Sequence, residues 1–376
     1  MEHSTPGQLI SELLAARGWT QRTLAVVLEK DESTINKILA GKGVVTTETA
    51  LALEDVFGVD AERFLELQRK YDLAVARIKS KPDTGRATRA ALFGDLPIAA
   101  MCKRGWLRAD DPQDLKAVEV GLTKFFGVST ASEIEILPHA ARKTHVNSEP
   151  TAAQMAWLYR VKSIAEDLLV PKFSQANLEK ALHKLHALTV APEEARHVPR
   201  ILAECGVRFV LVESLPSAKI DGVCFWLDDF SPVIGLTLRF DRIDNFWFVL
   251  RHEIEHVRLG HGRAAMILDT DLKGENAGQS QELPEEERLA NKAAQEFCVP
   301  SETMDAFIAR KAPFFSERDL LGFSKVVGVH PGIVAGQLQY KTGQYDKFRQ
   351  HLAAIRSHLG TGVAIDGWGE IYPFSE

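Results

Sequence analysis

The stretch that decides the N-terminal fold is residues 9–43, LISELLAARGWTQRTLAVVLEKDESTINKILAGKG. Thr20 is a good N-cap for a short helix, and the polar pair Lys30 and Asp31 predicts a tight turn into a second short helix that stops at Gly41. Two short helices joined by such a turn are typical of a helix-turn-helix. Apolar positions recur every three or four residues from 7 to 76, so we expect an all-α DNA-binding domain over residues 1–79.

The second helix of the pair leaves small or flexible hydrogen-bonding side chains on its open face. A recognition helix would present these to base edges and phosphates: Ser33, Thr34, Asn36 and Lys37. Gln21 and Lys42 flank the pair and are the predicted phosphate contacts. Residues 1–79 contain 10 Lys and Arg against 12 Asp and Glu, so one copy should bind DNA weakly. We therefore expect a homodimer on operator DNA with two half-sites. The alternative is a helical bundle used only for protein contact.

Residues 18–42, followed by TETALALEDVFGVDAERFLELQRKYDLA at 47–74, resemble a known family of regulators. They are similar to the Cro-repressor (XRE) type of helix-turn-helix in HigA-family antitoxins. The resemblance covers most of residues 7–76. It implies binding to an operator and a toxin as a protein partner.

Length and charge limit what the rest of the chain can be. A chain of 376 residues exceeds the roughly 250 to 300 at which single cores stop growing, so we expect several domains. The formal charge of −6 excludes a polycationic nucleic-acid binder, so any DNA contact must be local. No signal-peptide pattern begins the chain and no apolar run reaches about 18 residues, which predicts a cytoplasmic protein without membrane contact. The four cysteines lack CxxC spacing and are predicted to pack in cores.

The pattern along the chain changes twice. A polar stretch with Pro and Gly at 80–104 predicts a boundary near residue 80, and helical patterns then predict a helical middle domain at 80–170. From residue 206 the runs GVRFVLVESL, DGVCFWL and PVIGLTLRF have the composition of strands. Helical patterns follow at 246–259 and 285–298. We therefore expect a multidomain chain with an α+β domain at 171–345 and a tail at 346–376.

Residues 246–262, FWFVLRHEIEHVRLGHG, contain His252, Glu253 and His256 in HExxH spacing. Residues four apart lie on one face of a helix, so the two imidazoles can share a metal ion. Glu253 lies about 100° round the helix and can serve a metal-bound water as general base. The alternative is a surface helix with solvated side chains. The apolar residues at 246–250 favour a buried helix, where such groups are costly without a partner.

A catalytic zinc needs a third protein ligand. His261 is one possibility, and Gly262 excludes the metzincin class, which has a histidine at that position. Glu287 is favoured over Glu286 because it lies one turn before Asn291, whose amide could hold the ring of a ligand histidine. The sequence predicts a gluzincin-like Zn²⁺ site made by His252, His256 and Glu287.

The segments HEIEHVRLGH at 252–261 and ERLANKAAQEFCVP at 287–300 together resemble the ImmA/IrrE family of metallopeptidases. In that family a HExxH helix is followed by a glutamate-bearing helix that ends at a hydrophobic-Pro stop. The resemblance implies a zincin-like fold, zinc on His252, His256 and Glu287, and Glu253 as the catalytic base. Glu255 departs from the family, which usually has glycine or another small residue there.

Two further features bear on catalysis. His330 precedes a Pro-Gly turn and is a candidate for stabilising an oxyanion, with a helix-capping or core histidine as the alternative. The strand at 233–240 is a candidate edge for an extended substrate.

Two functions follow from these features. The first is a transcriptional regulator whose zinc metalloendopeptidase domain cleaves a partner or repressor protein. The second is a HigA-like antitoxin or repressor whose zincin domain is a catalytically weak sensor or toxin-binding platform. A scaffold with vestigial motifs is the third, plainest alternative.

Overall fold

The chain divides into two compact units, Met1–Thr84 and Gly85–Glu376. A computed structural model describes residues 5–79, 90, 94, 96–109, 111–131, 133–134, 141–143, 150–264, 266–270, 272, 284–359 and 364–372. Each unit has its own hydrophobic core.

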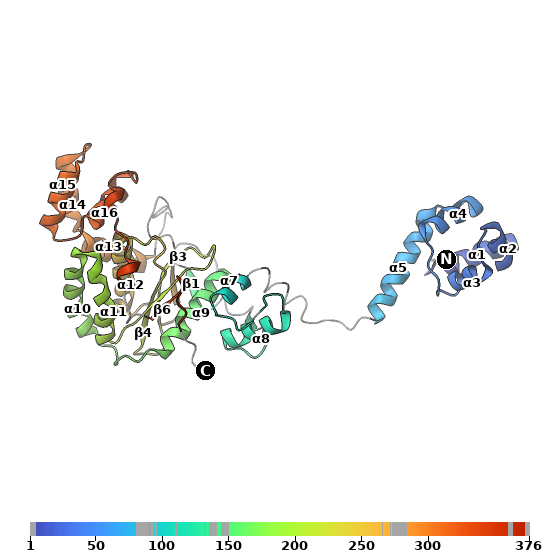
Figure 1. Ribbon diagram of the computed structural model, residues 1–376, viewed down its shortest axis with the longest axis horizontal. Coiled ribbons are helices and arrows are strands. Elements are labelled where there is room, and N and C mark those ends of the chain that lie inside the picture. Colours follow the sequence, from blue (N-terminus) through green and yellow to red (C-terminus); the bar gives the residue numbers. More distant parts are fainter. Residues whose placement is uncertain are drawn as a thin grey trace. The chain divides into compact units, whose positions relative to one another are not determined.

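The first unit is all-α, as predicted (Figure 1). Its helices are α1 (Pro6–Arg17), α2 (Gln21–Val27), α3 (Glu32–Leu39), α4 (Thr47–Phe57) and α5 (Ala61–Lys79). The hydroxyl of Thr20 accepts the backbone N–H of Thr23 at 3.1 Å, which caps α2. Leu24 of α2 and Ile35 and Ile38 of α3 are buried in the same core cluster, so the two helices are held together by apolar packing.

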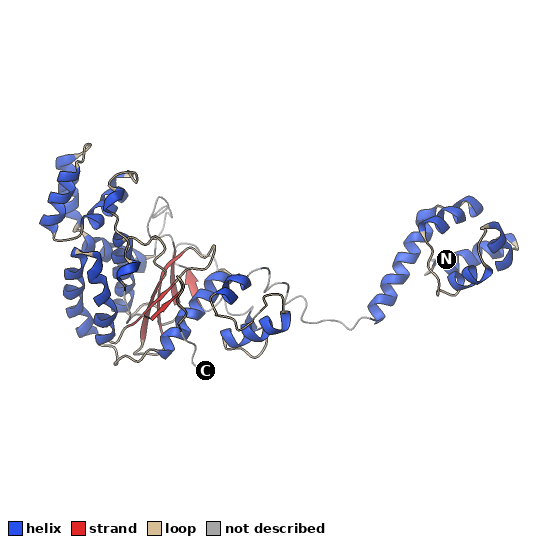
Figure 2. Ribbon diagram, in the orientation of Figure 1, coloured by secondary structure: helices blue, strands red, loops and turns tan. Residues whose placement is uncertain are grey.

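The second unit is built on a mixed sheet, drawn in red in Figure 2. Its strands are β1 (Ala141–Lys143), β2 (Arg208–Val212), β3 (Ile220–Trp226), β4 (Pro232–Leu236), β5 (Met266–Thr270) and β6 (Ala364–Asp366). They lie in the order β1-β5-β3-β4-β2-β6. Strand β3 runs antiparallel to both β4 and β5, whereas the β1–β5, β2–β4 and β2–β6 pairs are parallel.

Helices cover both faces of this sheet (Figure 1). Along β2, Phe209 and Leu211 belong to the core shared with α12, while Val210 and Val212 belong to the core shared with α9. This is the alternation that successive strand residues must show. The helices are α7 (Ile98–Lys103), α8 (Leu115–Phe126), α9 (Ala152–Asp167), α10 (Gln175–Ala187), α11 (Val198–Glu204), α12 (Ile243–Leu259), α13 (Glu285–Cys298), α14 (Ser301–Lys311), α15 (Glu317–Val327) and α16 (Pro331–Thr342). Short 3₁₀ turns are η2 (Leu188–Val190), η3 (Pro192–His197), η4 (Arg349–His351) and η5 (Arg356–His358).

The helical middle predicted at 80–170 is part of this second unit. Helix α9 is buried nearly all round, and Trp157 donates its indole N–H to the carbonyl of Val212 in β2 at 3.0 Å. The contiguous core explains the difference from a separate domain, because a helix that is buried on most sides must pack against the sheet as well as against its neighbouring helices.

The predicted tail at 346–376 also joins the sheet, through β6. Asp366 is fully buried and forms a salt bridge with Arg160 of α9, which is 1% exposed. The strand predicted at 233–240 is not an edge, because β4 pairs with β3 on one side and β2 on the other. That position is therefore corrected: an extended substrate cannot add to β4. Among the described residues, each helix is too short or too polar to span a bilayer.

Candidate functional site

Helix α12 carries the HExxH residues into the interior of the second unit. His252, Glu253 and His256 are each 0% exposed, which excludes the solvated surface helix. The helix ends at Leu259 and is capped by Gly260, whose φ of 73° lies in the left-handed region that glycine adopts easily. Helix α13, which bears Glu287, packs against α12. The two helices therefore hold their buried polar side chains against each other.

Four buried side chains bring their donor atoms together: His252, His256, Asp269 and Glu287. The Nε2 atoms of His252 and His256 lie 3.0 Å apart. A Glu287 oxygen lies 3.3 Å from Nε2 of His252, and the other lies 3.2 Å from Nε2 of His256. Oδ2 of Asp269 lies 3.5 Å from Nε2 of His252. All four donor atoms lie within 4.8 Å of one another.

These separations can be compared with a tetrahedral zinc site. Zinc bonds to nitrogen and oxygen are about 2.0–2.1 Å long, which places neighbouring donors about 3.3 Å apart. The four separations between donor atoms given above, 3.0 to 3.5 Å, lie around that value. Both Glu287 oxygens are buried and receive no hydrogen bond from the described residues. Buried carboxylate oxygens need a partner, and a shared cation would supply one.

The outer nitrogens of the two rings are held by other side chains. Nδ1 of His252 lies 3.1 Å from Oδ1 of Asn291, which is the relationship predicted for that amide. Nδ1 of His256 lies 3.0 Å from Nδ1 of His261. His261 therefore lies behind a ring of the cluster, and the four grouped donors do not include it. Rings fixed from behind keep Nε2 directed at the shared centre.

Glu253 packs against the backbone of β3. A Cβ on Gly222 would lie 2.2 Å from Oε1 of Glu253, so a larger residue at this position would force the Glu253 side chain or the backbone to shift. Gly222 is also the register partner of Asp269 in β5. The sheet thus places Asp269 in the strand position next to Gly222, the residue on which the Glu253 side chain packs.

The electrostatics of the cluster call for positive charge. Burial lowers the pKa of His252, but the carboxylates of Asp269 and Glu287 outweigh burial and raise that pKa to about 10. Burial and the neighbouring Asp269 carboxylate raise the pKa of Glu253 well above its ordinary range. With neutral rings, Asp269 and Glu287 carry two negative charges, which a dication would balance.

Glu255 does not crowd this centre. One of its oxygens lies 2.7 Å from Arg251, and the other forms a 2.5 Å bridge with Arg258. Burial raises its pKa, but the Arg258 hydrogen bond and the Arg251 charge hold it below the ordinary value. The charge of Glu255 is therefore compensated by two arginines, away from the donor atoms.

His330 is far from the cluster. Its Nδ1 accepts the N–H of Gly332 at 3.0 Å and so caps α16. A Cβ on Gly332 would lie 3.1 Å from this ring and 2.9 Å from Ile243, the first residue of α12. His252 is nine residues further along, about 13 Å at 1.5 Å per residue. The oxyanion role predicted for His330 is therefore corrected to helix capping.

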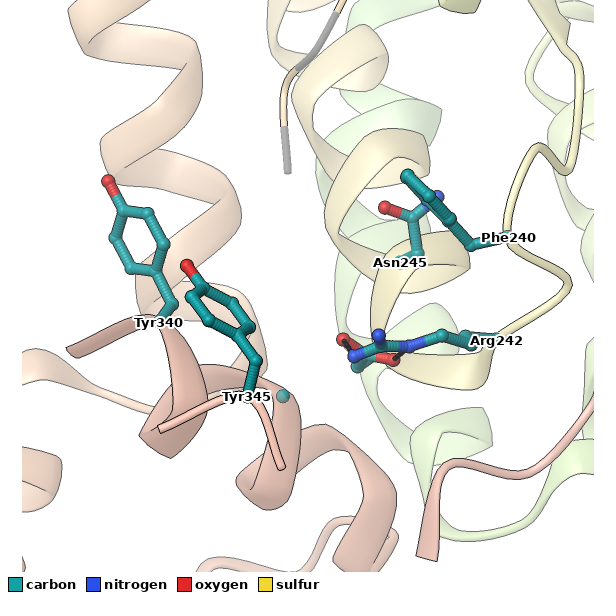
Figure 3. A pocket seen from close by; sticks show the side chains of 7 residues that line it. Phe240, Arg242, Asn245, Tyr340 and Tyr345 are labelled. Carbon is teal, nitrogen blue, oxygen red and sulfur yellow. Dashed lines mark hydrogen bonds and ion pairs between the residues drawn. The ribbon is translucent and has the colours of Figure 1, made fainter. Parts of the chain in front are cut away.

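A small pocket also lies at this beginning of α12 (Figure 3). Its lining residues are Phe240, Arg242, Asp244, Asn245, Gly336, Tyr340 and Tyr345. Arg242 reaches the Asp244 carboxylate at 2.9 Å, so its charge is already paired. None of the four clustered residues His252, His256, Asp269 and Glu287 lines this pocket.

In the first unit the predicted DNA contacts all lie on the surface. Buried Ile35 and Ile38 turn one face of α3 inward. The opposite positions are exposed, as are those that flank the pair: Gln21, Ser33, Thr34, Asn36, Lys37 and Lys42. The structure therefore leaves all six side chains accessible to a ligand.

Comparison with known proteins identifies the first unit. A family profile described as helix-turn-helix matches residues 10–64. Virulence-associated protein I of Dichelobacter nodosus is 38% identical over 72 residues, which is 19% of this chain and 67% of that protein. An uncharacterized HTH-type transcriptional regulator, YddM of Escherichia coli strain K12, is 35% identical over 74 residues, or 20% of this chain and 79% of that protein. The chain belongs to the helix-turn-helix family.

One solved structure also aligns with this helix-turn-helix protein. It is an addiction module antidote protein of a HigA family from Coxiella burnetii, with 29% identity, coverage of 20% of this chain and 94% of that chain, and a TM-score of 0.18. The helix-turn-helix profile ends at residue 64, so the donor cluster at 252–287 lies beyond the matched residues.

Sequence reasoning on this helix-turn-helix protein missed Asp269. No motif marks the residue, because strand pairing rather than helix spacing brings it to the imidazoles. Its signal was the run MILDT, in which a charged residue follows three apolar ones. The sequence did predict that the other three residues of the cluster would lie together.

Proposed function

We propose that the chain is a DNA-binding transcriptional regulator whose second unit is a zinc-dependent metallopeptidase domain of ImmA/IrrE type that acts on a partner protein in the cytoplasm. The observation that carries the proposal is the convergence of His252, His256 and Glu287 within 3.3 Å of one another in a fully buried site. Glu253, on the same helix, is the general base of the proposal.

The side chains of the chain have separate tasks in this proposal. His252, His256 and Glu287 would hold the ion, while Asn291 and His261 keep the rings in place. Zinc in such a site lowers the pKa of a water and polarises a peptide carbonyl. Glu253, which Gly222 admits beside the sheet, would accept the proton and pass it to the leaving amine.

Elemental analysis of protein purified without added zinc tests the metal site. One zinc per wild-type chain, and none in His252→Ala, is expected. Glu253→Gln should retain the zinc and lower cleavage of a quenched-fluorescence peptide library at least about a hundredfold. Equal zinc in wild type and His252→Ala would reject the site. Equal cleavage by wild type and Glu253→Gln would reject the assigned base.

DNA binding by the first unit is supported by its family and by the exposed side chains of α3. The relative from E. coli is described as a transcriptional regulator, and we extend that role to this chain. A homodimer on two half-sites remains part of the proposal, because the first unit has no excess of basic residues.

A second candidate function is a HigA-like antitoxin or repressor whose zincin domain senses metal or binds a toxin. Asp269 favours it, because a fourth donor group lies among the proposed ligands, and a site with four protein ligands has no open position. Zinc-loaded protein that binds DNA, cleaves no peptide library and loses DNA affinity on chelation would select this function over the peptidase.

A further inference from the structure

We infer that Asp269 is a fourth protein ligand, so that this conformation holds the ion in a closed and catalytically silent site. This inference rests on the proposed metal site, and it adds that the site is closed and inactive in this conformation. A catalytic zinc site has three protein ligands and one open position, whereas a site with four is closed.

The placement of Asp269 follows from the sheet. Leu268 packs in the core on the α9 side of β5, so the next side chain must point to the opposite face, where α12 lies. Asp269 is 0% exposed there, and its Oδ2 lies 3.5 Å from Nε2 of His252. That nitrogen is the same one that faces Glu287 at 3.3 Å.

A supporting role behind a ring is the other common task of such a carboxylate. In that role the carboxylate receives the ring N–H that points away from the metal. Here Asn291 already occupies the Nδ1 side of His252, and His261 occupies the Nδ1 side of His256. Asp269 approaches the inner nitrogen instead, on the side of the ring where the ion would lie. The geometry is that of a ligand.

The consequence concerns activity. With Asp269 bound, no coordination position is left for a substrate carbonyl or a water. Asp269 must leave the ion before Glu253 can act on anything held there. The chain would then store a peptidase in a latent form, and a partner or ligand that displaces Asp269 would release it.

Cobalt substitution tests this without measuring cleavage. Full-length protein is stripped of metal, loaded with Co²⁺ and titrated with azide while its visible absorption spectrum is recorded. Wild type should show no spectral change, because its four ligands leave azide no site. Asp269→Ala should show a clear change and bind Co²⁺ more than about tenfold more weakly.

Asp221→Asn is the matched control. Asp221 is buried in the neighbouring strand β3 and is not one of the four donor residues. This variant should retain the wild-type spectrum, affinity and indifference to azide. Asp269→Asn replaces Asp269→Ala if the smaller side chain prevents folding.

Each result decides the question. A wild-type spectrum that shifts with azide as readily as that of Asp269→Ala overturns the inference, as does an equal Co²⁺ affinity of the two proteins. Those outcomes leave the proposed three-ligand site intact. Failure of the proposed site looks different: wild type and His252→Ala would then bind Co²⁺ equally or not at all.

Discussion

Oδ1 of Asn291 lies 3.1 Å from Nδ1 of His252. The other ring nitrogen of His252, Nε2, faces the carboxylates of Glu287 and Asp269. Only an amide or another acceptor at this position can bind the N–H of a ring whose inner nitrogen is unprotonated. The relationship fixes both the orientation and the tautomer of the imidazole.

Asn291→Ala should therefore weaken zinc binding roughly ten- to a hundredfold, the usual effect of losing such a partner. Competition with a chromophoric chelator measures the affinity. Lys292→Ala, at the exposed neighbouring position of α13, is the control and should bind zinc like wild type. An unchanged affinity in Asn291→Ala would show that the ring needs no support.

Gly222→Ala should destabilise the second unit. The added methyl would lie 2.2 Å from Oε1 of Glu253 in a fully buried site, so side chains or backbone must shift at a cost of about 1–3 kcal/mol. Urea unfolding measures the free energy. Gly322→Ala in α15 is the control: no atom lies within 4 Å of its added Cβ, and we expect a gain of about 0.4–1 kcal/mol. Equal effects of the two variants would contradict the packing of Glu253 on β3.

Asp319 should titrate at unusually low pH. A hydrogen bond from Lys311, at 2.6 Å, and another from Ser316 lower its pKa from 3.8 to about 2. Because the folded pKa lies below the ordinary one, its stabilising contribution is present above pH 3.8 and is lost as the pH falls through about 2. Carboxyl ¹³C shifts in an NMR titration measure this midpoint.

Lys311→Met should move that midpoint up towards 3.8, whereas Lys325→Met, at an exposed position of α15, should not move it. A wild-type midpoint already near 3.8 would mean that the bridge between α14 and α15 does not form in solution.

Replacing Asn36 and Lys37 together with alanine should weaken binding to a DNA duplex selected by the wild-type chain from a random pool. Loss of one good base contact costs about 1–3 kcal/mol, or roughly ten- to a hundredfold in affinity, and loss of one phosphate contact lowers the salt slope by about one. Fluorescence anisotropy at several salt concentrations measures both. Lys70→Ala, whose exposed ammonium pairs with Glu66 at 2.9 Å, is the control. If the double variant bound DNA as tightly as wild type, the assignment of α3 as the recognition helix would be wrong.

Local signals in the sequence predicted the first unit well. Thr20 caps α2 and Gly41 follows α3, and both are short-range effects that a single sequence displays. The spacing of His252 and His256 predicted a shared face for the same reason. Glu287 and Asn291 lie one turn apart, and packing of α13 on α12 brings that face to the imidazoles.

Long-range pairing accounts for what the sequence did not predict. Asp269 reaches the site through the register of β5 on β3, and β6 is only three residues long. Neither leaves a periodic signal. Helix α9 was predicted to belong to a separate middle domain, because its sequence does not indicate which sheet face it packs against.

Strand β6 gives the C-terminal residues a part in protecting the whole second unit. A nonsense mutation or proteolytic clip before Ala364 would remove the strand that pairs with β2 and leave its backbone amides and carbonyls open to other molecules. It would also leave the Arg160 guanidinium in the apolar interior without the Asp366 carboxylate that balances its charge. Truncated chains are therefore expected to aggregate, because the exposed edge of β2 can pair with strands of other molecules.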